Sequence, residues 1–141
     1  PYQVPLAKNF GADCILIILS AVDKILAKDL YQAANQLNMS TIVEVHSEDE
    51  AEFALSFEKS LIGINNRNLK TLETSLNTSI KLSKILEDHK SPLISESGIN
   101  AVENINFIIE NAKIHNFLIG ESLLKSQNIA SKLREFSQIT L

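Results

Sequence analysis

The residues best suited to chemistry in this chain follow directly on an apolar run. After residues 61–64 the chain continues without a spacer into Asn65, Asn66, Arg67 and Asn68. The planar guanidinium of Arg67 can hold a carboxylate or phosphate through two parallel hydrogen bonds, and the amides can read hydroxyl groups beside it. This segment therefore suits an anionic ligand. Taken alone, the same residues also fit a polar loop with a solvated arginine.

One carboxylate, that of Glu44, is the main candidate for acid–base work. Glu44 lies near the end of the apolar run 41–45, and a carboxylate among apolar walls can have its pKa moved toward neutrality. The alternative is an ionised residue paired with a cation. Glu96 either orients a cationic partner or simply pairs with one. His46 lies two residues after Glu44, on the same side of a strand, where a structural hydrogen bond is favoured over catalysis.

Five apolar segments alternate with helical patterns along the chain. The expected strands are residues 14–19, 41–45, 61–64, 93–96 and 116–119. No Asn-Gly or Asp-Gly turn separates them, so the pattern predicts βα units and a parallel sheet of the α/β class. The sequence has neither a Gly-rich dinucleotide loop after the first strand nor a P-loop.

Polar residues fall at the C-terminal end of every expected strand. In parallel βα architectures these ends meet at one edge, and eight-stranded barrels commonly hold phosphate in the loops after the last two strands. Here those strands end in Ser97-Gly98 and Gly120-Glu121. Because glycine lets backbone N–H groups approach an anion closely, we predict a phosphate site at these turns.

Composition narrows the classes of function. The chain has 141 residues, 45% of them hydrophobic, which predicts one globular unit. A net charge of −4 with dispersed basic residues argues against nucleic-acid or anionic-membrane partners. No apolar run is long enough to span a membrane, so we expect a cytoplasmic protein. The single cysteine, Cys14, reads as a small buried hydrophobe, and no residue set has metal-ligand spacing.

Four segments together resemble the indole-3-glycerol phosphate synthase family of tryptophan biosynthesis. They are VEVHSEDE (43–50), LIGINNRNLKT (61–71), ISESGI (94–99) and FLIGESLL (117–124), in the same order and at suitable spacing. PYQV (1–4) and GADCILII (11–18) also fit, so the resemblance covers essentially the whole chain. ESG and IGES alone are shared among phosphate-binding barrels, whereas VEVH with GINNRNL is specific.

The resemblance implies a (β/α)8 TIM barrel and a carbon–carbon lyase that needs no cofactor or metal. Its members close the ring of 1-(2-carboxyphenylamino)-1-deoxyribulose 5-phosphate with loss of carbon dioxide and water. Carried over by motif, the residues are Glu44, Asn65 and Glu96 for catalysis, Arg67 and Ser97 for substrate, and Gly98, Gly120 and Glu121 for phosphate. Some members carry serine in place of Glu121, so only its backbone N–H is expected to help a phosphate, with the carboxylate pointing away.

Barrel closure needs eight strands, and we find five. The family's first strand carries a catalytic glutamate and lysine, and its third carries the lysine regarded as the general acid; this sequence has none of them. We therefore expect residues 1–141 to form a single partial barrel domain, from the third helix onward, without the first three strands. We expect it to be inactive alone, and to self-associate or to pair with the missing N-terminal part. The alternatives are a non-catalytic phosphate-binding remnant and another phosphate-binding barrel, such as phosphoribosylanthranilate isomerase.

Overall fold

A parallel sheet of five strands forms the centre of the computed structural model, which describes residues 2–138. The strands lie in the sheet in the order of the sequence, and neighbours pair in parallel. Their bounds are Cys14–Ile18 for β1, Ser40–Val45 for β2, Leu61–Asn65 for β3, Leu93–Glu96 for β4 and Asn116–Leu118 for β5. The predicted α/β class and the partial barrel of five strands are confirmed.

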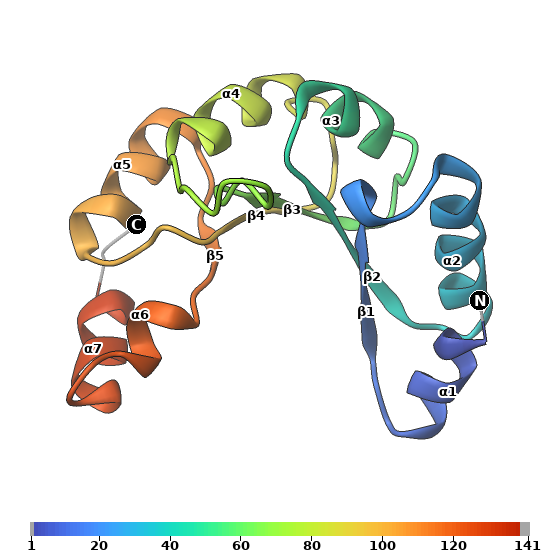
Figure 1. Cartoon of the computed structure of the whole chain (residues 1–141), viewed down its shortest axis with the longest axis horizontal. Helices are drawn as coiled ribbons and strands as arrows, with labels where there is room; N and C mark the ends of the chain where they lie inside the picture. The colour runs from blue at the N-terminus through green and yellow to red at the C-terminus, as the bar shows by residue number, and fades with distance from the viewer. Residues whose placement is uncertain (1, 139–141) are drawn as a thin grey trace.

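Helices connect the strands and lie mainly on the outer side of the curved sheet (Figure 1). They are α1 (Gln3–Asn9), the short 3-10 helix η1 (Leu19–Ala21), α2 (Lys24–Gln36), α3 (Glu48–Ala54), α4 (Asn77–Ile85), α5 (Val102–Ala112), α6 (Glu121–Leu124) and α7 (Ile129–Ser137). Pro1 lies outside the described residues. None of the helices within residues 2–138 combines the length and apolarity that crossing a membrane requires.

The two faces of the sheet are covered differently. Val43 of β2 and Ile62 of β3 are fully buried and belong to the main core, together with Leu82 of α4 and Ile108 of α5. This core therefore lies between the sheet and the outer helices. Because side chains alternate along a strand, the residues next to Val43 and Ile62 point to the opposite, concave face. That face receives the polar residues discussed below.

Cys14 is exposed, so its prediction as a buried hydrophobe is wrong. β1 is an end strand of the sheet and pairs on one side only, with β2. Cys14 and Leu16 lie in register with Ser40 and Ile42, on the concave side of this edge. Leu16 is 51% exposed as well. An apolar run alone cannot tell a central strand from an end strand, which explains the error.

Asn66 holds the end of β3 in place, because its amide is engaged in hydrogen bonds within the protein. Its side chain is buried, and its Nδ2 donates hydrogen bonds to Ser95 Oγ at 3.0 Å and to the Ser97 carbonyl at 3.1 Å. Its Oδ1 accepts hydrogen bonds from the backbone N–H of Ser79 at 3.1 Å and from Ser79 Oγ at 2.9 Å. One side chain thus joins β3 to β4 and to α4.

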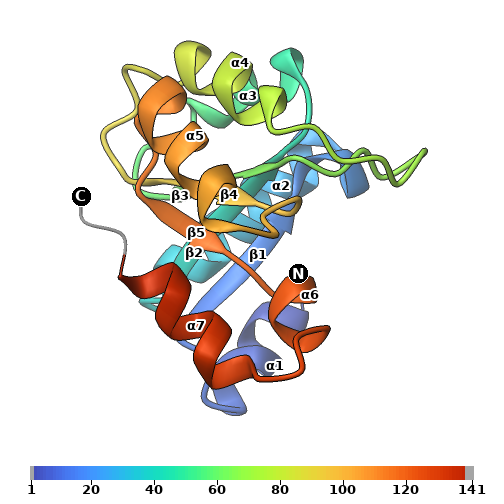
Figure 2. The same ribbon diagram turned by 90° about the vertical axis from the view of Figure 1, so that its left-hand side faces the viewer.

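The loop after β3 is itself ordered by backbone pairing. Arg67 and Thr74 form an antiparallel bridge, so the loop folds back on itself before α4 begins. Figure 2 shows this segment extending away from the sheet. The pairing fixes the position from which Arg67 projects.

We expect Asn66→Ala to lower the free energy of unfolding by about 3 kcal/mol, because it leaves buried groups of Ser79 and Ser95 without this partner. Urea denaturation of the variant and the parent chain measures the change. The matched control is Asn35→Ala at an exposed position of α2, for which we expect a change within about 0.5 kcal/mol. Equal effects of the two substitutions would contradict the role of Asn66.

Candidate active site

The strand register brings three predicted catalytic residues to the concave face. Glu44 of β2 pairs with Gly63 of β3, and Asn65 of β3 pairs with Glu96 of β4. All four positions alternate with residues that pack against the helices, so they share the face away from the core. The expectation that strand ends converge at one edge therefore holds for Glu44, Asn65 and Glu96.

Asn65 links the carboxylate of Glu44 to the loop that carries Arg67. Its Nδ2 donates a hydrogen bond to Glu44 Oε1 at 3.0 Å, and its Oδ1 accepts one from the backbone N–H of Arg67 at 2.9 Å. These two bonds fix which way the amide faces, because donor and acceptor cannot be exchanged without losing both. Asn65 therefore orients Glu44 and the start of the loop together.

Glu44 and Glu96 are both buried, with 5% and 4% of their surface exposed. The pKa of Glu96 is raised to about 7, mainly because its side chain is buried and also because the Glu44 carboxylate lies beside it. Burial acts in the same direction on Glu44, but its contacts with His46 and Asn65 and the charge of His46 outweigh burial and lower its pKa. At a pH well below 7, where Glu96 keeps its proton, the pair therefore holds one ionised and one protonated carboxyl group.

Gly63 makes room for Glu96, a role that the sequence analysis did not identify. A Cβ atom at position 63 would lie 2.0 Å from Glu96 Oε1. The Glu96 side chain therefore lies across β3 at the one position where that strand has no side chain. A glycine inside an otherwise apolar strand is the signal for such a close approach.

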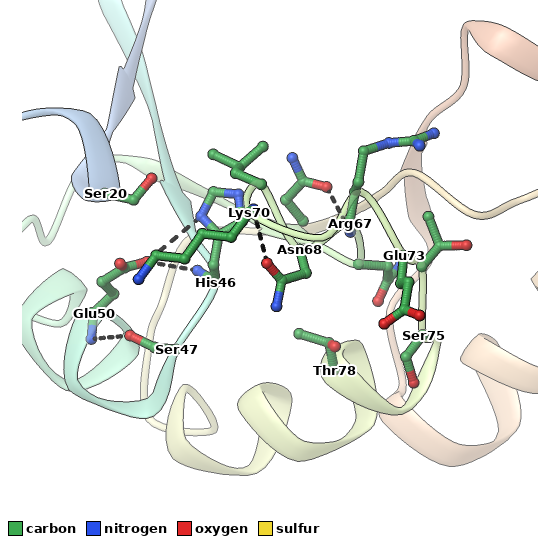
Figure 3. A pocket seen from close by; sticks show the side chains of 14 residues that line it. Ser20, His46, Ser47, Glu50, Arg67, Asn68, Lys70, Glu73, Ser75 and Thr78 are labelled. Carbon is green, nitrogen blue, oxygen red and sulfur yellow. Dashed lines mark hydrogen bonds and ion pairs between the residues drawn. The ribbon is translucent and has the colours of Figure 1, made fainter.

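Two of the cavities at the C-terminal edge of the sheet border Arg67. The larger, of 930 Å³, lies between the loops that follow β2 and β3, and Figure 3 shows its polar lining. Its walls include His46, Asn65 and Arg67. The smaller, of 380 Å³, has a lining that includes Arg67, Ser97, Gly98, Gly120 and Glu121. The predicted substrate and phosphate residues thus meet around one cavity, and Arg67 borders both cavities.

We had expected the Glu121 carboxylate to point away from this smaller cavity, but it contacts Arg67, which lines the cavity. Its two oxygens accept hydrogen bonds from Arg67 Nη2 and Lys125 Nζ, each at 2.5 Å. Lys125, followed by Arg67, lowers the pKa of this exposed carboxyl group. An anion that binds Arg67 here must compete with an internal carboxylate. The sequence analysis did not identify Lys125 as a site residue, because its contact with Glu121 depends on the short helix α6 after β5.

The turn after β4, where glycine was predicted to let backbone N–H groups approach an anion, has a left-handed backbone conformation. Gly98 has φ +75°, and Ser97 before it also lies in the left-handed region at φ +67°. A side chain at Gly98 would be strained by its φ and would also come within 3.3 Å of Thr74. Gly120 has no such constraint, since open space surrounds it.

The fold and the site define a partial (β/α) barrel with a polar site at the C-terminal ends of its strands. Among solved structures, the thiamine phosphate pyrophosphorylase of Pyrococcus furiosus shares this fold with a TM-score of 0.71. It is 17% identical, and the match covers 96% of this chain and 62% of that one. The family model of indole-3-glycerol phosphate synthase matches residues 1–136, and the chain belongs to this family.

Curated relatives agree with the family assignment. The indole-3-glycerol phosphate synthase of Legionella pneumophila (strain Lens) is 42% identical over 134 residues, covering 95% of this chain and 51% of the relative. Indole-3-glycerol phosphate synthase 2 of Ralstonia nicotianae is 43% identical over 141 residues, covering 100% and 52%. The chain thus spans about half the length of the curated relatives it matches.

The raised pKa of Glu96 predicts a pH dependence of stability. Its carboxyl group ionises near pH 7 in the folded chain and near 4.5 when unperturbed. Between these values the folded state keeps a proton that the unfolded state has released, so the free energy of unfolding falls as pH rises, by about 3 kcal/mol at most. Below pH 4.5 this contribution is fully present.

We expect Glu96→Gln, which cannot ionise, to gain stability relative to the parent chain between pH 5 and pH 8. Urea denaturation of both proteins across this range measures the difference. Contributions from His46, whose pKa is raised, are present in both proteins and largely cancel. Glu110→Gln, at an exposed position of α5, is the matched control and should show no trend. A constant difference between Glu96→Gln and the parent chain would contradict the account.

Proposed function

We propose that this chain supplies the C-terminal strands of an indole-3-glycerol phosphate synthase, acting on 1-(2-carboxyphenylamino)-1-deoxyribulose 5-phosphate. The observation that carries the proposal is the concave-face cluster of Glu44, Asn65 and Glu96 beside the Arg67 cavities. The family assignment supports the reaction class, a carboxy-lyase of tryptophan biosynthesis.

The two carboxyl groups suit opposite proton transfers in this reaction. Ring closure joins an aromatic carbon to the ketone carbon of the substrate, carbon dioxide leaves the ring, and the former ketone oxygen leaves as water. The ketone oxygen must gain two protons, one when the ring closes and one when it leaves as water, and the neighbouring carbon must lose one. Glu44, kept ionised, is suited to accept a proton, whereas Glu96, neutral below about pH 7, is suited to donate one.

The remaining residues suit the charges of the substrate. Arg67 offers a guanidinium to the ring carboxylate or to the phosphate. Ser97 and the backbone at Gly98 and Gly120 border the smaller cavity, which suits a phosphate group held by N–H donors. An anion that binds Arg67 in this cavity must displace the Glu121 carboxylate from the guanidinium.

Turnover requires, on this proposal, three further strands that complete the barrel. β1 and β5 each pair on one side only. Leu16 of β1 and Leu118 of β5 are about half exposed. Such edges favour pairing with additional strands. We propose that the partner is the N-terminal part of the same barrel, with self-association as the competing outcome. The cytoplasmic location rests on the family's biosynthetic role and stays a prediction.

A non-catalytic phosphate-binding remnant is the second candidate. It would bind phosphate at the smaller cavity, lined by Ser97, Gly98 and Gly120, without turnover. The family assignment leaves phosphoribosylanthranilate isomerase without support.

The decisive assay is the fluorescence of the indole product when the carboxyphenylamino substrate is mixed with this chain or with a version extended upstream by three strands. We expect turnover only in the extended version, because the five-stranded sheet lacks the strands that would close the barrel opposite Glu44 and Glu96. In that version Glu44→Gln should lower kcat by about a hundredfold or more, while Glu110→Gln should not. Turnover in neither protein would favour the remnant, and turnover by the short chain would contradict the need for further strands.

A further inference from the structure

His46 lies between two carboxylates, those of Glu44 and Glu50. Its Nε2 is 3.1 Å from Glu44 Oε1, and its Nδ1 is 3.5 Å from Glu50 Oε2. Only 12% of its side chain is exposed. Neither ring nitrogen is aligned for a hydrogen bond, so both contacts are electrostatic ones at ion-pair distance.

The Glu50 carboxylate is held where it meets the ring. Ser47 caps α3, and its Oγ accepts a hydrogen bond from the Glu50 backbone N–H at 3.3 Å. In return, Glu50 Oε2 accepts a hydrogen bond from the His46 backbone N–H at 2.7 Å. Figure 3 shows these three residues together at the rim of the larger cavity. The arrangement resembles a capping box, so the carboxylate that faces the ring is anchored by local structure.

On its other side, Glu44 is bound by Asn65. The amide and the imidazole both contact Oε1 of Glu44. Two contacts on one oxygen fix the direction of the carboxylate. The series Glu50, His46, Glu44 and Asn65 therefore runs from the N-terminus of α3 to the end of β3.

The surroundings of His46 are predominantly acidic. Glu44 faces it from β2 and Glu50 from α3, and Glu96 of β4 stands beside Glu44. Arg67 and Lys70, from the loop after β3, line the larger cavity with His46. Lys81 of α4 and its ion-pair partner Glu48 of α3 line a further cavity that His46 also borders. The contact with Glu44 is the main reason why the pKa of His46 is raised, against the opposing effect of burial; the charge of Glu50 adds to the rise.

We propose that His46 is a positioning residue, clamped by Glu50, which holds the Glu44 carboxylate in a fixed direction toward the substrate. The inference rests on the proposed function only in taking Glu44 as the group that meets substrate. The imidazolium also supplies the positive charge that lets Glu44 stay ionised next to Glu96. His46 thereby decides which of the two carboxyl groups carries the proton.

The test is an NMR titration of this chain, which needs no turnover. Labelled side-chain carboxyl carbons report Glu44 and Glu96, the imidazole carbons report His46, and the Asn65 amide reports its hydrogen bond to Glu44. In His46→Gln we expect the titration midpoints of Glu44 and Glu96 to rise, because burial is then no longer offset. The Asn65 amide signals should follow the new Glu44 midpoint, and Glu121, far from this cluster in sequence and on another cavity, should keep its own.

Glu50→Gln tests whether the charge of Glu50 holds His46, and this test remains informative if His46→Gln fails to fold. The glutamine can still accept the hydrogen bond from the His46 backbone, but it carries no charge. We expect the His46 midpoint to fall in Glu50→Gln and to stay at the parent value in Glu52→Gln, which removes a charge at an exposed position of the same helix. Unchanged midpoints of His46 in Glu50→Gln and of Glu44 in a folded His46→Gln would overturn the proposal. Because these titrations do not depend on catalysis, their failure is distinct from a failure of the proposed function.

Discussion

Two carboxyl groups buried side by side cannot both carry a charge at low cost, and the site is arranged around this constraint. His46 and Asn65 both contact Glu44 and favour its ionised form. Glu96 faces the Glu44 carboxyl group itself, a contact that favours the protonated form of Glu96, and its Oε1 is buried without a hydrogen bond. Gly63 leaves the space that Glu96 occupies. The difference between the two groups thus comes from their neighbours, since both are glutamates on adjacent parts of one face.

Much of the fold and part of the site follow from short-range regularities of the sequence. Alternating apolar and helical segments predict the parallel sheet, because the hydrophobic pattern of each strand and helix is visible within a short stretch of sequence. Glu44, Asn65 and Glu96 meet because strands in parallel end at one edge, and the period of two along a strand assigns them to one face. Ser47 as the N-cap of α3 is equally local.

Other features depend on contacts that the sequence does not encode locally. Asn65 and Asn66 are the same residue type in adjacent positions, yet one meets Glu44 and the other is buried among Ser79 and Ser95. The ion pair of Arg67 with Glu121 joins residues 54 positions apart. The exposure of Cys14 depends on β1 being an end strand. Each of these requires the neighbours in space to be known.

The central claim is that the folded chain holds one protonated buried carboxyl group, that of Glu96, beside an ionised Glu44. Infrared difference spectroscopy at about pH 6, between the ordinary carboxyl pKa and the value of about 7 for Glu96, measures this directly. The account predicts a protonated carboxyl band that disappears in Glu96→Gln and persists in Glu44→Gln. A band lost in Glu44→Gln but kept in Glu96→Gln, or no such band in the parent chain, would contradict it.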